Sequence, residues 1–147
     1  MSVLLIAQIL IITMFSSQTA EKSSEISKSI MDKMEWVPES IPRETPDRAG
    51  TISLHQIIRK LAHFYNFFIV GVLLGAIYIS LKENGRQALL WASFGLLVAI
   101  ADELHQHFVP GRSAEVYDVL VDFSGVLFGM SFIKVFLGII FAKRCRK

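Results

Sequence analysis

The first stretch that carries chemically useful side chains lies at the start of an apolar run and contains Arg59, Lys60, His63 and Asn66. On a helix, Arg59, His63 and Asn66 fall at intervals of four and three residues, so they line one face, with Lys60 beside them. Guanidinium and ammonium groups bind anions, and an imidazole exchanges protons near neutral pH. The stretch therefore predicts a cationic face at one end of a helix.

A second polar group ends another apolar run, between residues 102 and 107. Asp102, His105 and Gln106 share one helical face, whereas Glu103 and His107 share a second face turned away by roughly 100°. Exposing ionised side chains to lipid costs free energy, so it is unfavourable for both faces to point outward. We expect this helix to direct polar side chains toward other parts of the protein.

The last apolar run begins with Asp118 and Asp122, one helical turn apart. Gly125 and Gly129 continue the same stripe and form a surface of small residues that lets another helix approach closely. We therefore expect Asp122 to lie one turn inside the helix and to face the interior of a bundle.

One chemistry that fits these residue types is an anion site, in which Arg59, Lys60 and Arg112 hold a phosphate or carboxylate while a histidine or carboxylate transfers protons. A lipid head group is the natural anion at the membrane edge. The competing interpretation is that the same groups form only salt bridges and hydrogen bonds between helices. The binding residues predicted are Arg59, Lys60, His63, Asp102, Glu103, Gln106, Arg112, Asp118 and Asp122. The candidate catalytic residues are His63, Asp102, Glu103, His105 and Asp122.

The other chemistry is a divalent cation held by imidazole and carboxylate groups. The pool of ligands would be His63, Asp102, Glu103, His105, His107 and Asp122. No standard zinc motif such as His-Glu-x-x-His is present, so motif spacing predicts no metal site. The sequence also contains no Gly-x-x-x-x-Gly-Lys nucleotide loop and no Gly-x-Ser-x-Gly nucleophile elbow, and it indicates no particular cofactor.

The elements that position these groups are expected to be membrane helices, because 52% of the 147 residues are apolar and only 19% are charged. We expect a single all-α domain over residues 1–147, a polytopic membrane helical bundle of four transmembrane helices with an outer-face amphipathic segment. The predicted transmembrane segments are residues 1–16, 57–81, 87–108 and 117–142. A spanning helix needs about 20 apolar residues, and the first and third apolar runs are shorter. The third reaches this length only if its helix continues through the polar residues 102–108.

Basic residues set the expected orientation. Lys143, Arg144, Arg146 and Lys147 flank the last helix, which places the C-terminus in the cytoplasm by the positive-inside rule. The N-terminus is then also cytoplasmic, and the polar cluster is extracytoplasmic. The first apolar run could instead be a cleaved signal peptide, but no basic residue precedes it, which favours an anchor.

The segment 17–56 is expected outside the cell membrane. Within residues 23–36, Ile26, Ile30 and Met34 recur every fourth position, which predicts an amphipathic helix lying on the outer leaflet or packed on top of the bundle. Three prolines between residues 38 and 46 predict an extended linker, and Ser53-x-x-Gln56 predicts a capping box.

The motifs together resemble the signature of the VanZ-like family over nearly the whole chain. The stretches that carry the resemblance are Phe15-Ser16-Ser17-Gln18, Arg59-Lys60-Leu-Ala-His63-Phe64, Asp102-Glu103-Leu-His-Gln106-His-Phe108-Val-Pro110-Gly111-Arg112 and Asp118-Val-Leu-Val-Asp122-Phe-Ser-Gly125. Two positions depart from the family pattern: Asn66 stands where an acidic residue is common, and Phe67 where a tyrosine is common. A mechanism that needs a carboxylate or phenol at those positions is therefore not expected.

The resemblance implies a bacterial membrane protein of the cell envelope, related to a founding member linked to low-level teicoplanin resistance. It implies no particular reaction. Teicoplanin carries a lipid tail and acts outside the cell, which agrees with the orientation expected from the basic residues.

We therefore expect the polar cluster to bind a membrane lipid or a lipid-linked envelope precursor through its anionic group, and so to contribute to glycopeptide resistance. The alternative is a membrane-embedded hydrolase or transferase that acts on a lipid-linked phosphate. A proton relay through His63 and Asp122 is a third hypothesis, which is disfavoured because the ionisable groups are not spread through the bilayer depth.

The near-neutral net charge of +2 predicts no nucleic-acid partner. The glycine pairs Gly71-x-x-x-Gly75 and Gly125-x-x-x-Gly129 could serve packing within one chain or in a homo-oligomer.

Overall fold

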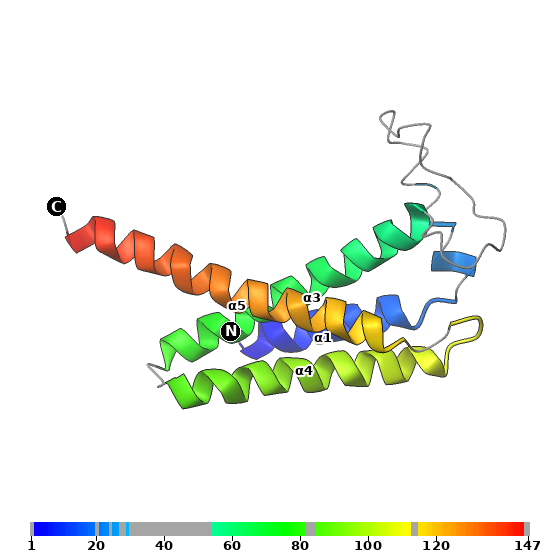
Figure 1. The fold of residues 1–147 in the computed structure, drawn as a ribbon, viewed down its shortest axis with the longest axis horizontal. Helices are drawn as coiled ribbons and strands as arrows, with labels where there is room; N and C mark the ends of the chain where they lie inside the picture. Colours follow the sequence, from blue (N-terminus) through cyan, green and yellow to red (C-terminus); the bar gives the residue numbers. More distant parts are fainter. Residues whose placement is uncertain are drawn as a thin grey trace.

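A computed structural model describes residues 2–19, 21–23, 25–26, 29, 54–81, 85–112 and 115–145. Its long helices are α1 (Ser2–Ser16), α3 (Leu54–Ser80), α4 (Gly85–His107) and α5 (Val116–Cys145), and the described part of the chain contains no strand (Figure 1). Most of the expected amphipathic helix over residues 23–36, the proline linker and the start of the capping box at Ser53 lie outside the described residues.

Three of these helices are long and apolar enough to cross a membrane, over Gln56–Ser80, Gly85–His107 and Val116–Ile140. Their outward surfaces carry large apolar side chains such as Leu89, which is 70% exposed, as expected where lipid takes the place of water. With 15 residues, α1 is about 22 Å long, shorter than the roughly 30 Å hydrocarbon layer of a bilayer. The described chain thus fits a membrane protein with three spans and a shorter apolar helix, where the sequence predicted four spans.

The closest helix pair is α3 and α5, which cross each other in Figure 1 and make more extensive contact than any other pair. Glycine allows this approach: a Cβ atom at Gly125 would lie 2.5 Å from the carbonyl oxygen of Phe64, and one at Gly129 would collide with the carbonyl oxygen of Phe68. The backbones therefore touch directly, as in other glycine-mediated membrane crossings. The glycine stripe of α5 is used for packing within the chain.

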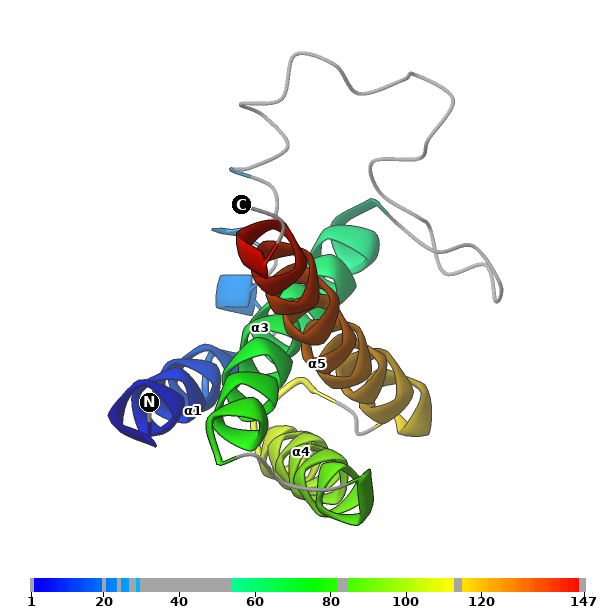
Figure 2. The same cartoon turned by 90° about the vertical axis from the view of Figure 1, so that its left-hand side faces the viewer.

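Seen end on, α3 lies at the centre of the bundle, with α1 on one side, α5 on the other and α4 below (Figure 2). The buried core gathers around α3, where Phe67, Val70 and Leu74 are fully enclosed, and Leu5 and Ile12 bring α1 into the same core. Among the described residues, α1 contacts α3 and α4 but not α5.

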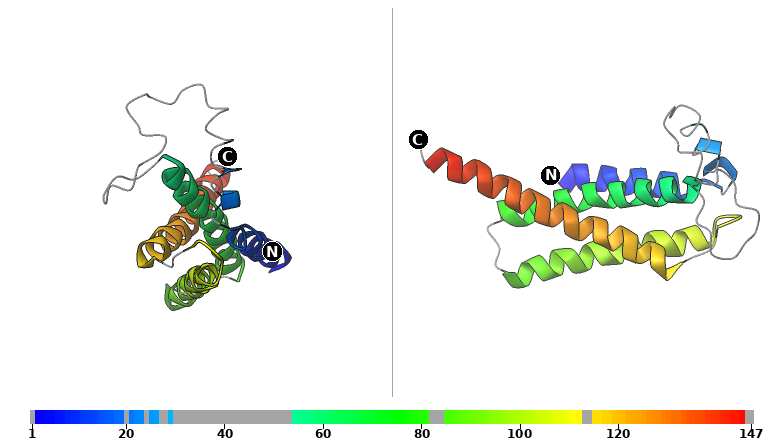
Figure 3. Two further views of the ribbon diagram at one scale, coloured as in Figure 1. Left: turned by 90° about the vertical axis from the view of Figure 1, so that its right-hand side faces the viewer. Right: turned by 45° about the horizontal axis from the view of Figure 1, so that its top comes forward.

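Successive helices run in opposite directions, so their polar ends meet at one end of the bundle (Figure 3). This end contains the last turns of α1 and α4 and the first turns of α3 and α5. The N-terminal start of α1 and the C-terminal end of α5 lie toward the other end (Figure 1). The topology therefore brings together polar groups from three different helices.

Candidate functional site

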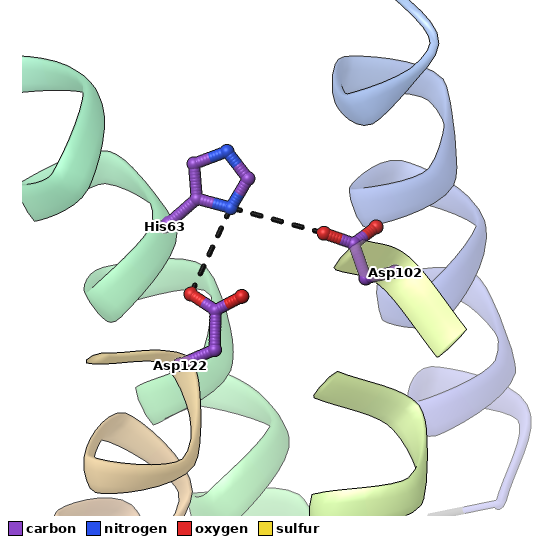
Figure 4. A group of neighbouring side chains, drawn as sticks. All are labelled: His63, Asp102 and Asp122. Carbon is purple, nitrogen blue, oxygen red and sulfur yellow. Dashed lines mark ion pairs between the residues drawn. The ribbon is translucent and has the colours of Figure 1, made fainter. Parts of the chain in front are cut away.

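Three ionisable side chains from three helices converge at this polar end. Nδ1 of His63 on α3 lies 3.8 Å from Oδ2 of Asp102 on α4 and 3.7 Å from Oδ1 of Asp122 on α5 (Figure 4). These separations are those of ion pairs and are too long for hydrogen bonds, whose donor and acceptor lie about 2.7–3.2 Å apart. We call these three residues the His63 cluster.

Asp122 is the most enclosed member of the His63 cluster. Its side chain is 1% exposed, and neither of its carboxylate oxygens has a hydrogen-bond partner among the described residues. The next residue on its stripe is Gly125, which brings α3 into backbone contact and so places the carboxylate against the imidazole. Asp122 faces the bundle interior, as its position on the glycine stripe predicted.

Gln106 connects the His63 cluster to the turn between α4 and α5. Its Nε2 donates to Oδ2 of Asp102 at 2.8 Å, and its Oε1 accepts from Nη1 of Arg112, also at 2.8 Å. The turn reaches back through Gly111, whose φ of 79° lies in the left-handed region that favours glycine. Burial, and then the neighbouring Arg59, lower the pKa of the Arg112 guanidinium, which stays protonated because the arginine pKa lies so far above neutral.

A cavity of about 220 Å³ opens beside this network, between α1, α3 and the α4–α5 turn. Its cationic groups are Arg59 and Arg112, and His63 also lies on its wall. Within the described part of the chain, neither arginine forms an ion pair with a carboxylate. The complete lining is Ile12, Phe15, Ser16, Gln18, Ser23, Ile26, Ile58, Arg59, Ala62, His63, Asn66 and Arg112.

Lys60 and Asp118, both predicted as binding residues, pair with each other outside this cavity. The Lys60 ammonium donates to Oδ1 of Asp118, lies 3.5 Å from Oε2 of Glu115 and sits 4.8 Å from the centre of the Tyr117 ring. Its positive charge is thus already balanced by α5. The structure places Lys60 in a helix-to-helix contact, separate from the two cavity arginines.

Glu103 and His105, both candidate catalytic residues, also lie apart from the His63 cluster. Oε1 of Glu103 accepts the backbone N–H of Glu115 at 2.7 Å and so caps the start of α5, and its Oε2 is buried without a hydrogen-bond partner in the described chain. The His105 ring is exposed, and its Nε2 lies 3.0 Å from Oγ of Ser17. Both residues help to join neighbouring elements.

The sequence analysis assigned no site role to the polar residues of α1. Ser16 is fully buried and its Oγ lies 3.5 Å from Nε2 of Gln106, so α1 contributes to the polar network. Gln8 donates from Nε2 to Oδ1 of Asn66 at 3.2 Å and ties α1 to α3. The available signal was the run Phe15-Ser16-Ser17-Gln18, where an apolar segment ends in polar residues.

A comparison with protein-family models identifies the family to which this chain belongs. The family model described as VanZ/LLP1 matches residues 1–137, which include α1, α3, α4 and all members of the His63 cluster. Searches among curated proteins and among solved structures found no match. With most of its length matched, the chain belongs to the VanZ/LLP1 family.

Proposed function

We propose that the protein binds the anionic head group of a membrane lipid, or of a lipid-linked envelope precursor, in the cavity between α1, α3 and the α4–α5 turn. The observation that carries the proposal is the pair of guanidinium groups, Arg59 and Arg112, that border the cavity without a carboxylate partner among the described residues. Two arginines that form no ion pair with a carboxylate in the described part of the chain can attract phosphate or carboxylate at a membrane edge, because guanidinium groups bind these anions through short, charge-assisted hydrogen bonds.

The remaining lining suits an amphiphile. Ile12 and Phe15 from α1 face Ile58 and Ala62 from α3, so apolar walls adjoin the two cations. Sites for whole drug-sized ligands measure roughly 300–1,000 Å³, whereas this cavity measures about 220 Å³. It would therefore hold a head group, while the acyl chains lie along the exposed apolar surfaces of the helices.

The same proposal includes an orientation. The basic residues at the C-terminal end of the chain, from Lys143 onward, would lie in the cytoplasm and the cavity at the extracytoplasmic face. α1 would serve as the fourth membrane helix, supported by the burial of Leu5 and Ile12 in the common core. At that face the protein would meet lipid-tailed glycopeptides such as teicoplanin. By binding anionic lipids, it would alter the access of these antibiotics to the envelope.

Binding can be measured with purified protein in a non-ionic detergent and short-chain phosphatidylglycerol as the titrant. Arg112→Ala and Arg59→Ala should each weaken binding by at least about tenfold, because a hydrogen bond to a charged group contributes roughly 1.5–3 kcal/mol. Lys134→Ala, which removes one positive charge farther along α5, is the matched control and should bind like the parent. Equal affinity in all four proteins would refute the head-group site.

The contribution to resistance is tested in cells that depend on this protein for tolerance of teicoplanin. Arg112→Ala and Asp102→Ala should reduce that tolerance at equal membrane abundance. If inserted and stable variants protect as well as the parent protein, the polar site has no part in resistance.

A second candidate function, hydrolysis or transfer at a lipid-linked phosphate, is favoured by the position of His63. The imidazole belongs both to the cavity wall and to the His63 cluster. Its Nδ1 faces the two carboxylates, while the other ring nitrogen points away from them (Figure 4). An imidazole whose Nδ1 is paired with carboxylates can exchange protons with a ligand through its other ring nitrogen, as general acid–base catalysis requires.

This candidate predicts turnover of a lipid phosphate or diphosphate by the purified protein, with loss of activity in His63→Gln and retention in His107→Gln. His107 is an exposed histidine at the end of α4 and serves as the control. Absence of phosphate release across a panel of envelope lipids would leave binding alone as the function.

A further inference from the structure

We propose that His63, Asp102 and Asp122 form a binding site for one divalent transition-metal ion, of the Zn²⁺ or Mn²⁺ type. The inference does not depend on lipid binding, because its ligands point toward one another and need no bound head group.

The first argument is the spacing of the three side chains. One ligand atom from each residue lies within 4.8 Å of the others, and the two contacts of His63 measure 3.7 and 3.8 Å. Two atoms that each bind one ion at about 2.1 Å with tetrahedral geometry lie roughly 3.4 Å apart. The observed separations exceed hydrogen-bond lengths and approach the separation of ligands that share an ion.

The second argument is the state of Asp122. A carboxylate enclosed to this degree is very unfavourable unless it is hydrogen-bonded, paired or bound to a metal. Both of its oxygens lack a hydrogen-bond partner among the described residues, and the carboxylate points into the space shared with His63 (Figure 4). A metal ion in that space would accept the carboxylate lone pairs to which no described group donates a hydrogen bond.

The third argument is charge. Even a protonated His63 balances only one of the two carboxylates, and Arg112 forms no ion pair with either of them in the described structure. A divalent cation would neutralise both carboxylates while the imidazole stays neutral and donates its lone pair.

The donor set indicates the class of ion. Imidazole suits zinc and the later transition metals, whereas carboxylate also suits manganese, so one nitrogen with two oxygens fits Zn²⁺ or Mn²⁺. Three protein ligands leave at least one coordination position open. His63 is 21% exposed and lines the cavity, which gives an ion a route of entry.

The surrounding structure would hold the ligands in place. Gln106 donates to Oδ2 of Asp102, a contact of the kind that orients metal-binding carboxylates. The direct backbone contact at Gly125 fixes the distance between α3 and α5, and so between His63 and Asp122.

The test uses full-length protein in detergent without anionic lipid, stripped with EDTA and titrated with Zn²⁺ alone or Mn²⁺ alone. We expect about one ion per chain, and affinity at least about tenfold weaker in Asp122→Asn and Asp102→Asn. Glu115→Gln is the control, because Glu115 is an exposed carboxylate at the same end of the bundle, and its affinity should match the parent. Binding that is absent for both ions, or unchanged in Asp122→Asn, would overturn the proposal.

Folding and coordination are checked separately. Without metal, Asp122→Asn should melt at the same or a higher temperature than the parent, because the amide removes a buried charge, so its loss of binding cannot be ascribed to unfolding. Pulsed electron paramagnetic resonance of bound Mn²⁺ should show nitrogen coupling that disappears in His63→Gln. Persistence of that coupling would assign the ion to another histidine and exclude this site.

Discussion

Arg112 donates a hydrogen bond from Nη1 to Oε1 of Gln106 at 2.8 Å, which ties a cation of the α4–α5 turn to the last turn of α4. Gln106 also donates to Asp102, so one buried amide connects the cavity to the His63 cluster. A change at Gln106 should therefore alter anion binding even though Gln106 does not line the cavity.

Gln106→Leu should reduce affinity for short-chain phosphatidylglycerol several-fold, because it releases the Arg112 side chain from its position. Titrations of Gln106→Leu, Arg112→Ala and the double variant would measure the coupling between the two residues. The double variant should bind no more weakly than Arg112→Ala alone. Fully additive losses would show that Gln106 does not act through Arg112.

The pair formed by Lys60 and Asp118 should be interchangeable. The two side chains are 22% and 18% exposed, so a single reversal, Lys60→Asp or Asp118→Lys, places like charges together in a half-buried contact. In a Glu115→Gln background, which removes the second carboxylate near Lys60, each single variant should melt at a lower temperature, and the double exchange should recover a coupling energy of about 1–3 kcal/mol. Thermal unfolding in detergent measures this, and an unrecovered double variant would argue against a direct ion pair.

Glu103 should matter through the α5 helix start that it caps. Glu103→Ala removes the acceptor for the Glu115 backbone N–H and should destabilise the protein by about 1 kcal/mol, or up to about 2. Glu103→Gln retains a carbonyl acceptor and should lose less. Melting temperatures of the two variants provide the comparison, and equal losses would indicate that the charge, and not the hydrogen bond, stabilises the turn.

The α3–α5 crossing should tolerate no methyl group at Gly129. A Cβ there meets the backbone of Phe68 and Gly71, so Gly129→Ala should cost about 1–3 kcal/mol through overpacking. Gly138 lies on the same helix with no neighbouring atom within 4 Å of such a Cβ, so Gly138→Ala should be neutral or stabilising by up to about 1 kcal/mol. Similar melting temperatures for the two variants would contradict the described crossing.

The orientation can be tested with the single cysteine. In intact cells, an impermeant maleimide should label Pro110→Cys in a Cys145→Ser background, because Pro110 lies exposed in the turn beside the polar end. The parent protein, with Cys145 at the end of α5, should be labelled only after permeabilisation. The reverse pattern would place the cavity on the cytoplasmic side.

Much of the helical framework is readable in the sequence, because apolar runs and polar ends mark where helices pass through lipid. The face shared by Arg59, His63 and Asn66 was also predictable from helical spacing, and all three residues line the cavity. The interior position of Asp122 followed from the glycines after it. These features depend only on periodicity within one helix.

The pairings between helices could not be predicted in the same way. Sequence spacing offered two polar faces on α4, and the structure buries Asp102 and Gln106 on one face and Glu103 on the other, because α4 contacts α1, α3 and α5. The partnership of Lys60 with Asp118 depends on where α3 crosses α5. A cluster whose three members come from three helices likewise leaves no motif along the chain.

The way α1 joins the bundle has a consequence for selectivity. One side of the cavity is formed by α3, which close glycine contacts hold against α5. The opposite side is formed by α1, a short helix that contacts only α3 and α4 in the described structure. Ser16 of α1 lies 3.5 Å from Nε2 of Gln106, and Oε1 of Gln106 accepts from Arg112, so a head group bulky enough to displace α1 would also disturb the support of the Arg112 guanidinium. The size of an accepted head group and the recognition of its charge would thus be coupled through α1.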